Sequence, residues 1–226
     1  MKKHNSILIA LLCCSILGFA QNNNLRILPV FGKTPITEDR WFVSANSDSL
    51  QFDNIRFYLS NISIELENGQ TIHDTERAHL IDVFEPSTLV ISFQNIHDKR
   101  FKKMRFNIGI DSTTSVAGAL GGDLDATKGM YWAWQSGYIN MKIEGRSPQC
   151  SNRKNVFQFH IGGYMQPYYA MRQLELPLNT EGVVLTVDVS KFFENIHISE
   201  QNSIMIPCKE AMSLADLSVQ LFSIEY

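Results

Sequence analysis

Residues 55–66, IRFYLSNISIEL, carry the pattern that decides the fold class. From Ile55 to Leu59 every second residue is apolar and would lie on one face of an extended chain, which is the alternation of a half-buried β-strand. After Ser60 and Asn61 the apolar positions shift by one residue. Such a shift predicts one extra residue at this point, either as a β-bulge or where the strand passes from one sheet to another.

Similar short strands are expected along the rest of the chain. Asn68 and Gly69 form a typical hairpin turn after the first of them. Helical spacing is confined to residues 209–216 and to one turn over residues 191–194 that Ser190 can cap. Since neither segment is long enough to cross over a parallel sheet, the sequence predicts an all-β, single-domain antiparallel sandwich or barrel with one or two short helical turns. The further strands are expected at residues 80–84, 89–93, 106–110, 138–144, 157–161, 183–189 and 221–226.

The start of the chain has the features of a secretory signal peptide. Two lysines precede an apolar run over residues 7–17 that is too short to span a bilayer, and small residues follow at Gly18 and Ala20. We expect cleavage after Ala20, which would leave residues 21–226 as a periplasmic or extracellular domain without a transmembrane segment. A lipoprotein anchor is the alternative, but neither cysteine in the apolar run follows a small residue.

Charge and cysteine content narrow the function classes. The formal net charge is −3, and the one basic cluster, residues 100–105, is interpreted as solvated strand-edge residues, so nucleic-acid binding is not expected. Beyond the signal the cysteines are Cys150 and Cys208. Because exported cysteines usually pair, we predict one disulfide between them, worth about 4–5 kcal/mol in the chain-entropy model. The alternative is a pair of soft metal ligands, although no C-x-x-C spacing supports it.

His160 is the histidine with the clearest potential for chemistry. It alternates with Phe159 and Ile161, so it faces away from that apolar pair, and two glycines follow it. A neutral imidazole in this position is a good ligand for copper or zinc, and the alternative is a partly buried histidine that is hydrogen-bonded to a neighbour. The other histidines beyond the signal have no ligand spacing and are interpreted as surface residues: His73, His79, His97 and His197.

Residues 111–128 form the longest stretch without a strand pattern, and such a loop is usually functional or disordered. Asp123 and Asp125 give a weak calcium-loop signal that lacks the ligand ladder of an EF-hand. The sequence has no nucleophile elbow and no phosphate-binding glycine loop. An enzyme is therefore not expected.

Two of the three tryptophans lie in residues 129–138, GMYWAWQSGY. Trp132 and Trp134 are two positions apart and would share one face of an extended strand. They either fill one end of a β-protein core or, together with Tyr138, form a stacking surface for a sugar or a peptide.

Four segments in order resemble motifs of the MbnP-like family: residues 57–62 (FYLSNI), 106–112 (FNIGIDS), 129–138 (GMYWAWQSGY) and 159–163 (FHIGG). The resemblance covers the chain from about Leu50 onward and implies a β-sandwich. It also implies an exported, non-catalytic protein that binds or delivers copper. The best-known members of the family and their functional relatives bind Cu(I) with histidine side chains and with a tryptophan that a partner di-haem enzyme of the MauG/peroxidase type oxidises to kynurenine.

The resemblance identifies His160 as a copper ligand, and Trp132 or Trp134 as the tryptophan that would be modified. Many copper-binding members also carry Asn-His in the preceding loop, but here residues 115–123 contain no histidine. A site with one histidine needs further soft donors, for which Met130, Met205 or a cysteine are candidates. The alternative is a metal-free interaction or ligand-binding module on the same scaffold.

Overall fold

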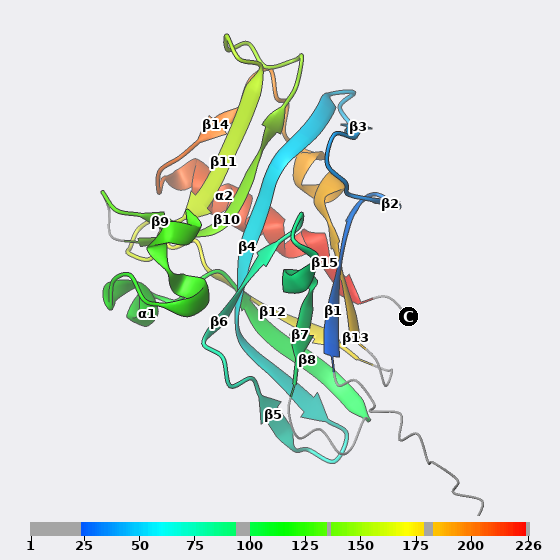
Figure 1. The fold of residues 1–226 in the computed structure, drawn as a ribbon, viewed down its shortest axis with the longest axis vertical. Helices are drawn as coiled ribbons and strands as arrows, with labels where there is room; N and C mark the ends of the chain where they lie inside the picture. Colours follow the sequence, from blue (N-terminus) through cyan, green and yellow to red (C-terminus); the bar gives the residue numbers. More distant parts are fainter. Residues whose placement is uncertain (1–23, 94–99, 135–136, 179–182, 225–226) are drawn as a thin grey trace, which may run out of the picture.

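The computed structural model describes residues 24–93, 100–134, 137–178 and 183–224, and it consists mainly of two β-sheets that pack against each other (Figure 1). The first sheet has the order β15-β13-β1-β2, and β7 also pairs with β1. The second has the order β12-β8-β4-β10-β11-β14, with β3, β5 and β6 paired to β4. The two-residue strand β9 pairs with β10. The predicted sandwich-like all-β class is confirmed.

The long strand β4 (Ser49–Leu66) organises the second sheet. Its first part pairs with β10 (Gly137–Arg146) and its second part with β8 (Phe101–Ile108). The register against β8 shifts between Ser60 and Ser63, and Asn61 has a positive φ of 51°. The shift in the apolar pattern therefore predicted this β-bulge correctly, and the bulge lies where β4 exchanges one neighbour for another.

The other expected strands are present, with shifted ends. The Asn68-Gly69 hairpin is confirmed by a hydrogen bond from the Leu66 amide to the Gln70 carbonyl (2.8 Å). The remaining strands of the second sheet are β3 (Trp41–Val43), β5 (Thr71–His73), β6 (Ala78–Asp82), β9 (Tyr131–Trp132), β11 (Val156–Gly162), β12 (Arg172–Pro177) and β14 (Ser203–Ile204).

Each sheet has one parallel pairing that the sequence patterns do not predict. Strands β1 (Asn24–Phe31) and β13 (Val183–Asp188) pair in parallel in the first sheet, and β11 and β14 do so in the second. The other pairings between described strands are antiparallel, as expected. The first sheet is completed by β2 (Thr34–Pro35), β7 (Val90–Ser92) and β15 (Phe222–Ile224).

The helices pack against the sheets, and α2 (Lys209–Ser218) and the 3-10 helix η4 (Val189–Phe193) contribute side chains to the main apolar core. The predicted helix near residues 209–216 is α2, and the predicted turn is η4. Asp188, not Ser190, caps η4, because its carboxylate accepts the amide of Ser190 at 3.1 Å. The other short helices are η1 (Pro86–Leu89), α1 (Ser112–Val116), η2 (Gly122–Leu124), η3 (Ala126–Lys128) and η5 (Val219–Leu221).

The apolar side chains form two clusters on opposite faces of the second sheet. The main core lies between the sheets and contains the phenylalanines of β4, β11 and η4, such as Phe52, Phe159 and Phe193. The smaller cluster lies on the outer face, around Tyr58 and Tyr138, and the segment with α1, η2 and η3 covers it. The long loop is thus an ordered cover over the outer face. Figure 1 shows β9 and α1 on the same side of the molecule, beside β10.

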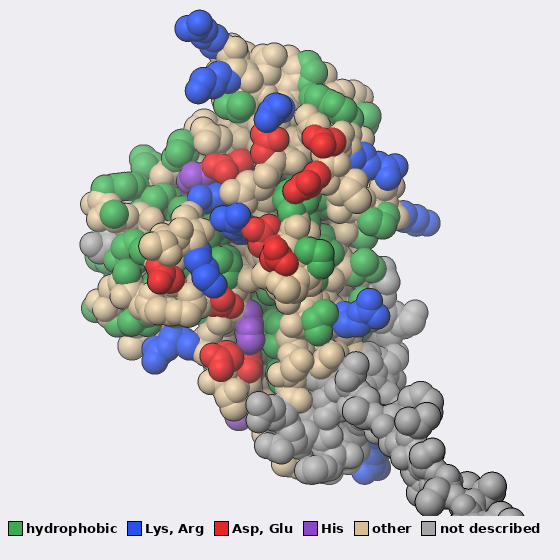
Figure 2. Space-filling model, in the orientation of Figure 1, with side chains coloured by type: hydrophobic (Ala, Val, Ile, Leu, Met, Phe, Trp, Pro, Cys, Tyr) green, Lys and Arg blue, Asp and Glu red, His purple; other side chains and the backbone are tan. Residues whose placement is uncertain are grey.

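The basic cluster faces solvent but is not at a sheet edge. Lys102, Lys103 and Arg105 lie on β8, which has a neighbour on each side, and they form ion pairs with Glu65 and Glu175. Figure 2 shows charges of both signs interspersed over the visible face. The predicted signal segment lies outside the described residues. Within the residues that are described, no helix is both long and apolar enough to traverse a bilayer.

Candidate functional site

His160 lies on the outer face of β11, as its position in the alternation predicted. Phe157, Phe159 and Ile161 of the same strand point into the main core. His160 pairs across the sheet with Lys142 of β10, and only 6% of its surface is exposed. The imidazole is therefore a nearly buried polar group that needs a hydrogen-bonding partner.

That partner is Glu144. The Nε2 atom of His160 lies 2.7 Å from Oε1 of Glu144. The hydrogen bond from His160 lowers the pKa of Glu144 to about 2, and nearby Lys142 adds to this effect, while burial opposes it. Glu144 is thus a carboxylate at neutral pH and can only accept hydrogen bonds. Nε2 of His160 must carry a proton to donate to it, and the tautomer that fits this contact has Nδ1 as the nitrogen with the free lone pair.

Two amides hold the Glu144 carboxylate in place. The Asn54 side chain donates to Oε2 at 3.1 Å, and the Gln158 side chain donates to Oε1 at 3.2 Å. These contacts orient the carboxylate toward His160. A carboxylate that fixes the tautomer and orientation of an imidazole is the usual second partner of a metal-binding histidine. Sequence reasoning missed Glu144, although it alternates onto the same outward face of its strand.

Trp132 packs against Gly162, which is two residues from His160 on β11. A Cβ atom added to Gly162 would lie 2.7 Å from Cζ3 of Trp132, so the indole rests directly on this glycine. Gly162 is two residues from His160 on β11, and side chains two apart on a strand share a face. Trp132 is only 6% exposed and belongs to the outer cluster.

Trp134 has a different environment from Trp132. Strand β9 ends at Trp132, and the following turn leaves Trp134 63% exposed. The two ring centroids remain 5.8 Å apart. The pair is therefore neither two core residues nor two surface residues: one ring is buried and the other is presented to solvent.

The other candidate ligands are dispersed. Met130 is buried in the outer cluster. His73 and His197 are exposed, as predicted, whereas His79 is half-buried and bonded to Asp74; His97 lies outside the described residues. Across residues 24–93, 100–134, 137–178 and 183–224, no group of three or more His, Cys, Asp or Glu side chains is arranged to hold a metal ion.

The two aspartates of the weak calcium-loop pattern, Asp123 and Asp125, make hydrogen bonds within the fold. Asp123 accepts the amide of Leu80 at 2.9 Å and pairs with Lys128 at 2.6 Å. Asp125 caps η3 through the amide of Thr127. Asp123 thus anchors the covering segment to β6, whereas Asp125 stabilises a turn within that segment.

The predicted disulfide between Cys150 and Cys208 is absent, and both are free thiols. Cys150 is buried in the main core just beyond β10, with its amide bonded to the Ser147 carbonyl. Cys208 is the N-cap of α2 and accepts the amide of Ala211 through Sγ at 3.4 Å. Each residue is thus engaged in separate local packing, which the compartment argument did not consider.

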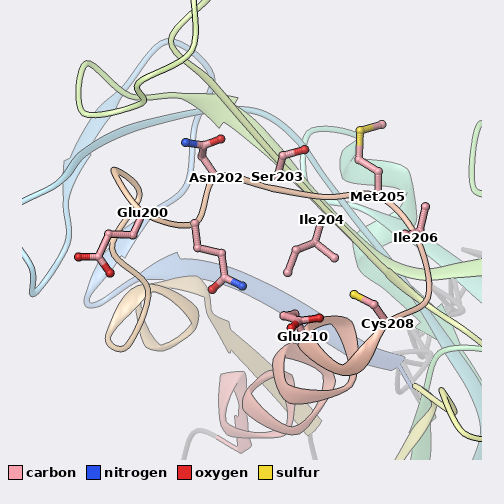
Figure 3. Close-up of a pocket in the computed structure, with 9 residues that line it drawn as sticks. Glu200, Asn202, Ser203, Ile204, Met205, Ile206, Cys208 and Glu210 are labelled. Carbon is pink, nitrogen blue, oxygen red and sulfur yellow. The ribbon is translucent and has the colours of Figure 1, made fainter.

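A pocket of about 600 Å³ lies at the β14 edge of the second sheet (Figure 3). The segment around β14 and the start of α2 line it, with Ile204, Cys208 and Glu210 among the lining residues. Burial, followed by the nearby Glu210, raises the pKa of the Cys208 thiol. The thiol is therefore a poor nucleophile at neutral pH.

These observations define a class: a sandwich-like, mostly β protein that carries a carboxylate-oriented histidine and a buried tryptophan on the outer face of one sheet. The family model MbnP matches residues 20–206, and the chain belongs to the MbnP family. MbnP from Methylosinus trichosporium has a similar structure, with a TM-score of 0.59, 13% sequence identity, and coverage of 85% of this chain and 83% of that chain. This likeness concerns the fold. No curated protein matches the sequence.

Proposed function

We propose that the protein is an exported, non-catalytic copper-binding protein, and that its site is formed by His160 and Trp132. The observation that carries this proposal is the hydrogen bond between Glu144 and Nε2 of His160. It leaves Nδ1 as the basic nitrogen, and no described residue hydrogen-bonds to Nδ1. An imidazole oriented in this way is prepared to donate to a metal ion.

Copper fits His160 but requires more donors than one imidazole. The indole of Trp132 has no free lone pair for a metal, whereas kynurenine has an amine nitrogen and a ketone oxygen. We therefore propose Trp132, and not Trp134, as the residue that is oxidised, because it rests on Gly162, two residues from His160 on β11. Trp134 lies 5.8 Å from it at the surface, where a partner di-haem enzyme of the MauG/peroxidase type would have access. Copper bound here would be a cargo ion held by nitrogen and soft donors.

Copper content tests the proposal. Protein from its native host is expected to contain about one copper per chain, and His160→Ala to contain almost none. His73→Ala is the control, because His73 is exposed and lies on β5, away from β11. Sub-stoichiometric copper in all three proteins, or equal copper with and without His160, would contradict the assignment. The intact mass of the same preparation reports whether a tryptophan has been oxidised.

A second candidate function follows from the exposure of Trp134. A metal-free member of the family would use this ring as a stacking surface for a sugar or a peptide. Of the two neighbouring tryptophans, Trp134 is the one with a free face, because Trp132 is buried. Under this alternative, Trp134→Ala abolishes ligand binding while copper content is low in every variant.

A further inference from the structure

We propose that Met205 supplies a sulfur donor beside His160, so that the two residues form a soft-metal pair where β11 meets β14. This inference rests on the proposed function, because it names the ligand that takes the place of a second histidine. It concerns unmodified side chains of this chain and does not depend on oxidation of a tryptophan.

The register of β11 and β14 places Met205 on the same face as His160. The two strands are parallel, with Gln158 opposite Ser203 and Phe159 opposite Ile204. Phe159 and Ile204 both point into the main core. His160, the next residue of β11, therefore faces outward. Strand β14 ends at Ile204, and Met205, the residue that follows it, lies on the opposite side of its chain from Ile204 (Figure 3).

The segments that follow β11 and β14 stay adjacent beyond the last paired residues, Phe159 and Ile204. A Cβ atom added to Gly163 would lie 3.2 Å from Cβ of Pro207, so the segment from Ile204 to Pro207 runs alongside the end of β11. Neighbouring strands lie about 4.8 Å apart. Met205 is consequently the residue of this segment that lies next to His160.

The side chain of Met205 is available for a ligand. Figure 3 shows it on the opposite side of the chain from Ile204, and both residues are among those that line the pocket. It is 41% exposed and does not belong to either apolar cluster. Three rotatable bonds allow the thioether to adjust its position. Thioether and imidazole donors together suit Cu(I), whereas hard cations prefer oxygen.

Cys208 is the competing sulfur donor and is less suited. Its Sγ is occupied by the amide of Ala211, and it lies on the pocket side of the segment, with Ile204. A ligand at Nδ1 of His160 would be on the other face of the sheet. The thioether of Met205 is therefore the nearer soft donor.

Silver(I), a soft ion that does not change its oxidation state, provides a direct test in the full chain. With ¹³C-methyl methionine labels, the Met205 signal is expected to shift on titration with Ag(I). Met205→Leu, which keeps the volume and removes the sulfur, should weaken Ag(I) affinity by about tenfold or more. Met165→Leu is the matched control, because Met165 is 53% exposed and lies on a different loop.

Three variants separate the outcomes. Weaker binding in both His160→Ala and Met205→Leu, with Met165→Leu unchanged, supports the pair. Weaker binding in His160→Ala alone overturns the role of Met205 and leaves the proposed function standing. Binding that depends on neither residue, or no binding at all, overturns both.

Discussion

The position of the proton on the His160 imidazole determines which ring nitrogen can bind a ligand. Glu144 determines its position, because a carboxylate accepts only from a protonated Nε2. Glu144 is thus a positioning residue: it acts on a ligand through His160. The amides of Asn54 and Gln158 support it by restraining the carboxylate.

Glu144→Gln should remove this control, because a glutamine amide can either accept from or donate to Nε2. We expect the Nε2-protonated tautomer to dominate in the wild type and a mixture of tautomers in the variant, as measured by ¹⁵N NMR of the imidazole. Glu175→Gln, a change at an exposed carboxylate on β12, is the control. An Nδ1-protonated ring in the wild type would refute this account of the site.

A second histidine–carboxylate pair predicts a pH effect on stability. Burial alone would raise the pKa of Asp74, but hydrogen bonds from His79 and from the Glu76 amide lower it below its usual value. A carboxyl group that is more acidic in the folded chain adds stability above its unfolded pKa of about 4. That contribution is lost as the pH falls through the lowered, folded-state pKa.

Asp74→Asn should therefore lose about 1–3 kcal/mol of unfolding free energy at neutral pH and approach the wild type in acid. Urea denaturation at several pH values measures both. Asp39→Asn, at an exposed turn position, should leave the curve unchanged. A deficit that is constant from neutral pH to acid would contradict the electrostatic origin of the effect.

At the scale of elements, local patterns predicted what single strands and helices do. The bulge in β4 and the helix α2 were predictable because burial on one face imposes a period that the chain itself displays. The parallel pairing of β1 with β13 was not, because strands far apart in sequence meet through packing that no local pattern encodes. The cap of η4 was ambiguous because Asp188 and Ser190 both carry side-chain acceptors.

The candidate site was likewise predictable from the sequence only in part. The outward position of His160 follows from alternation within β11. Its contact with Glu144 requires the register of β10 against β11, which only the folded sheet supplies. The contrast between Trp132 and Trp134 depends on where β9 ends, and strand ends are the least certain part of a sequence-based assignment.

The contact between β9 and β11 gives a prediction at Gly162. A methyl group there would lie 2.7 Å from the Trp132 ring and 2.7 Å from the Tyr138 carbonyl oxygen. Gly162→Ala should displace the indole, shift its fluorescence to the red, and cost about 1–3 kcal/mol by overpacking. Gly121→Ala is the control, since no atom lies within 4 Å of a Cβ at that position. Unchanged emission in Gly162→Ala would show that Trp132 does not rest on this strand.

At the scale of the whole molecule, two sheets and a continuous core hold the chain together without a covalent link between Cys150 and Cys208. The sequence favoured a bridge because both cysteines lie in loops of an expected exported protein. Their actual surroundings depend on tertiary packing: one thiol fills part of the core beyond β10, and the other caps α2.

The two thiols should therefore respond differently to the same substitution. Cys150→Ser buries a hydroxyl group in the core and is expected to cost about 1–3 kcal/mol. Cys208→Ser replaces a weak cap by a preferred one and should be neutral or slightly stabilising. A disulfide would instead make both variants lose the same amount, about 4 kcal/mol, because either change opens the same loop. Urea midpoints of the wild type and the two variants, each measured with and without reductant, distinguish these cases. Unequal losses of stability that reductant does not alter support free thiols. Equal losses in both variants, matched by the loss that reductant causes in the wild type, would restore the bridge.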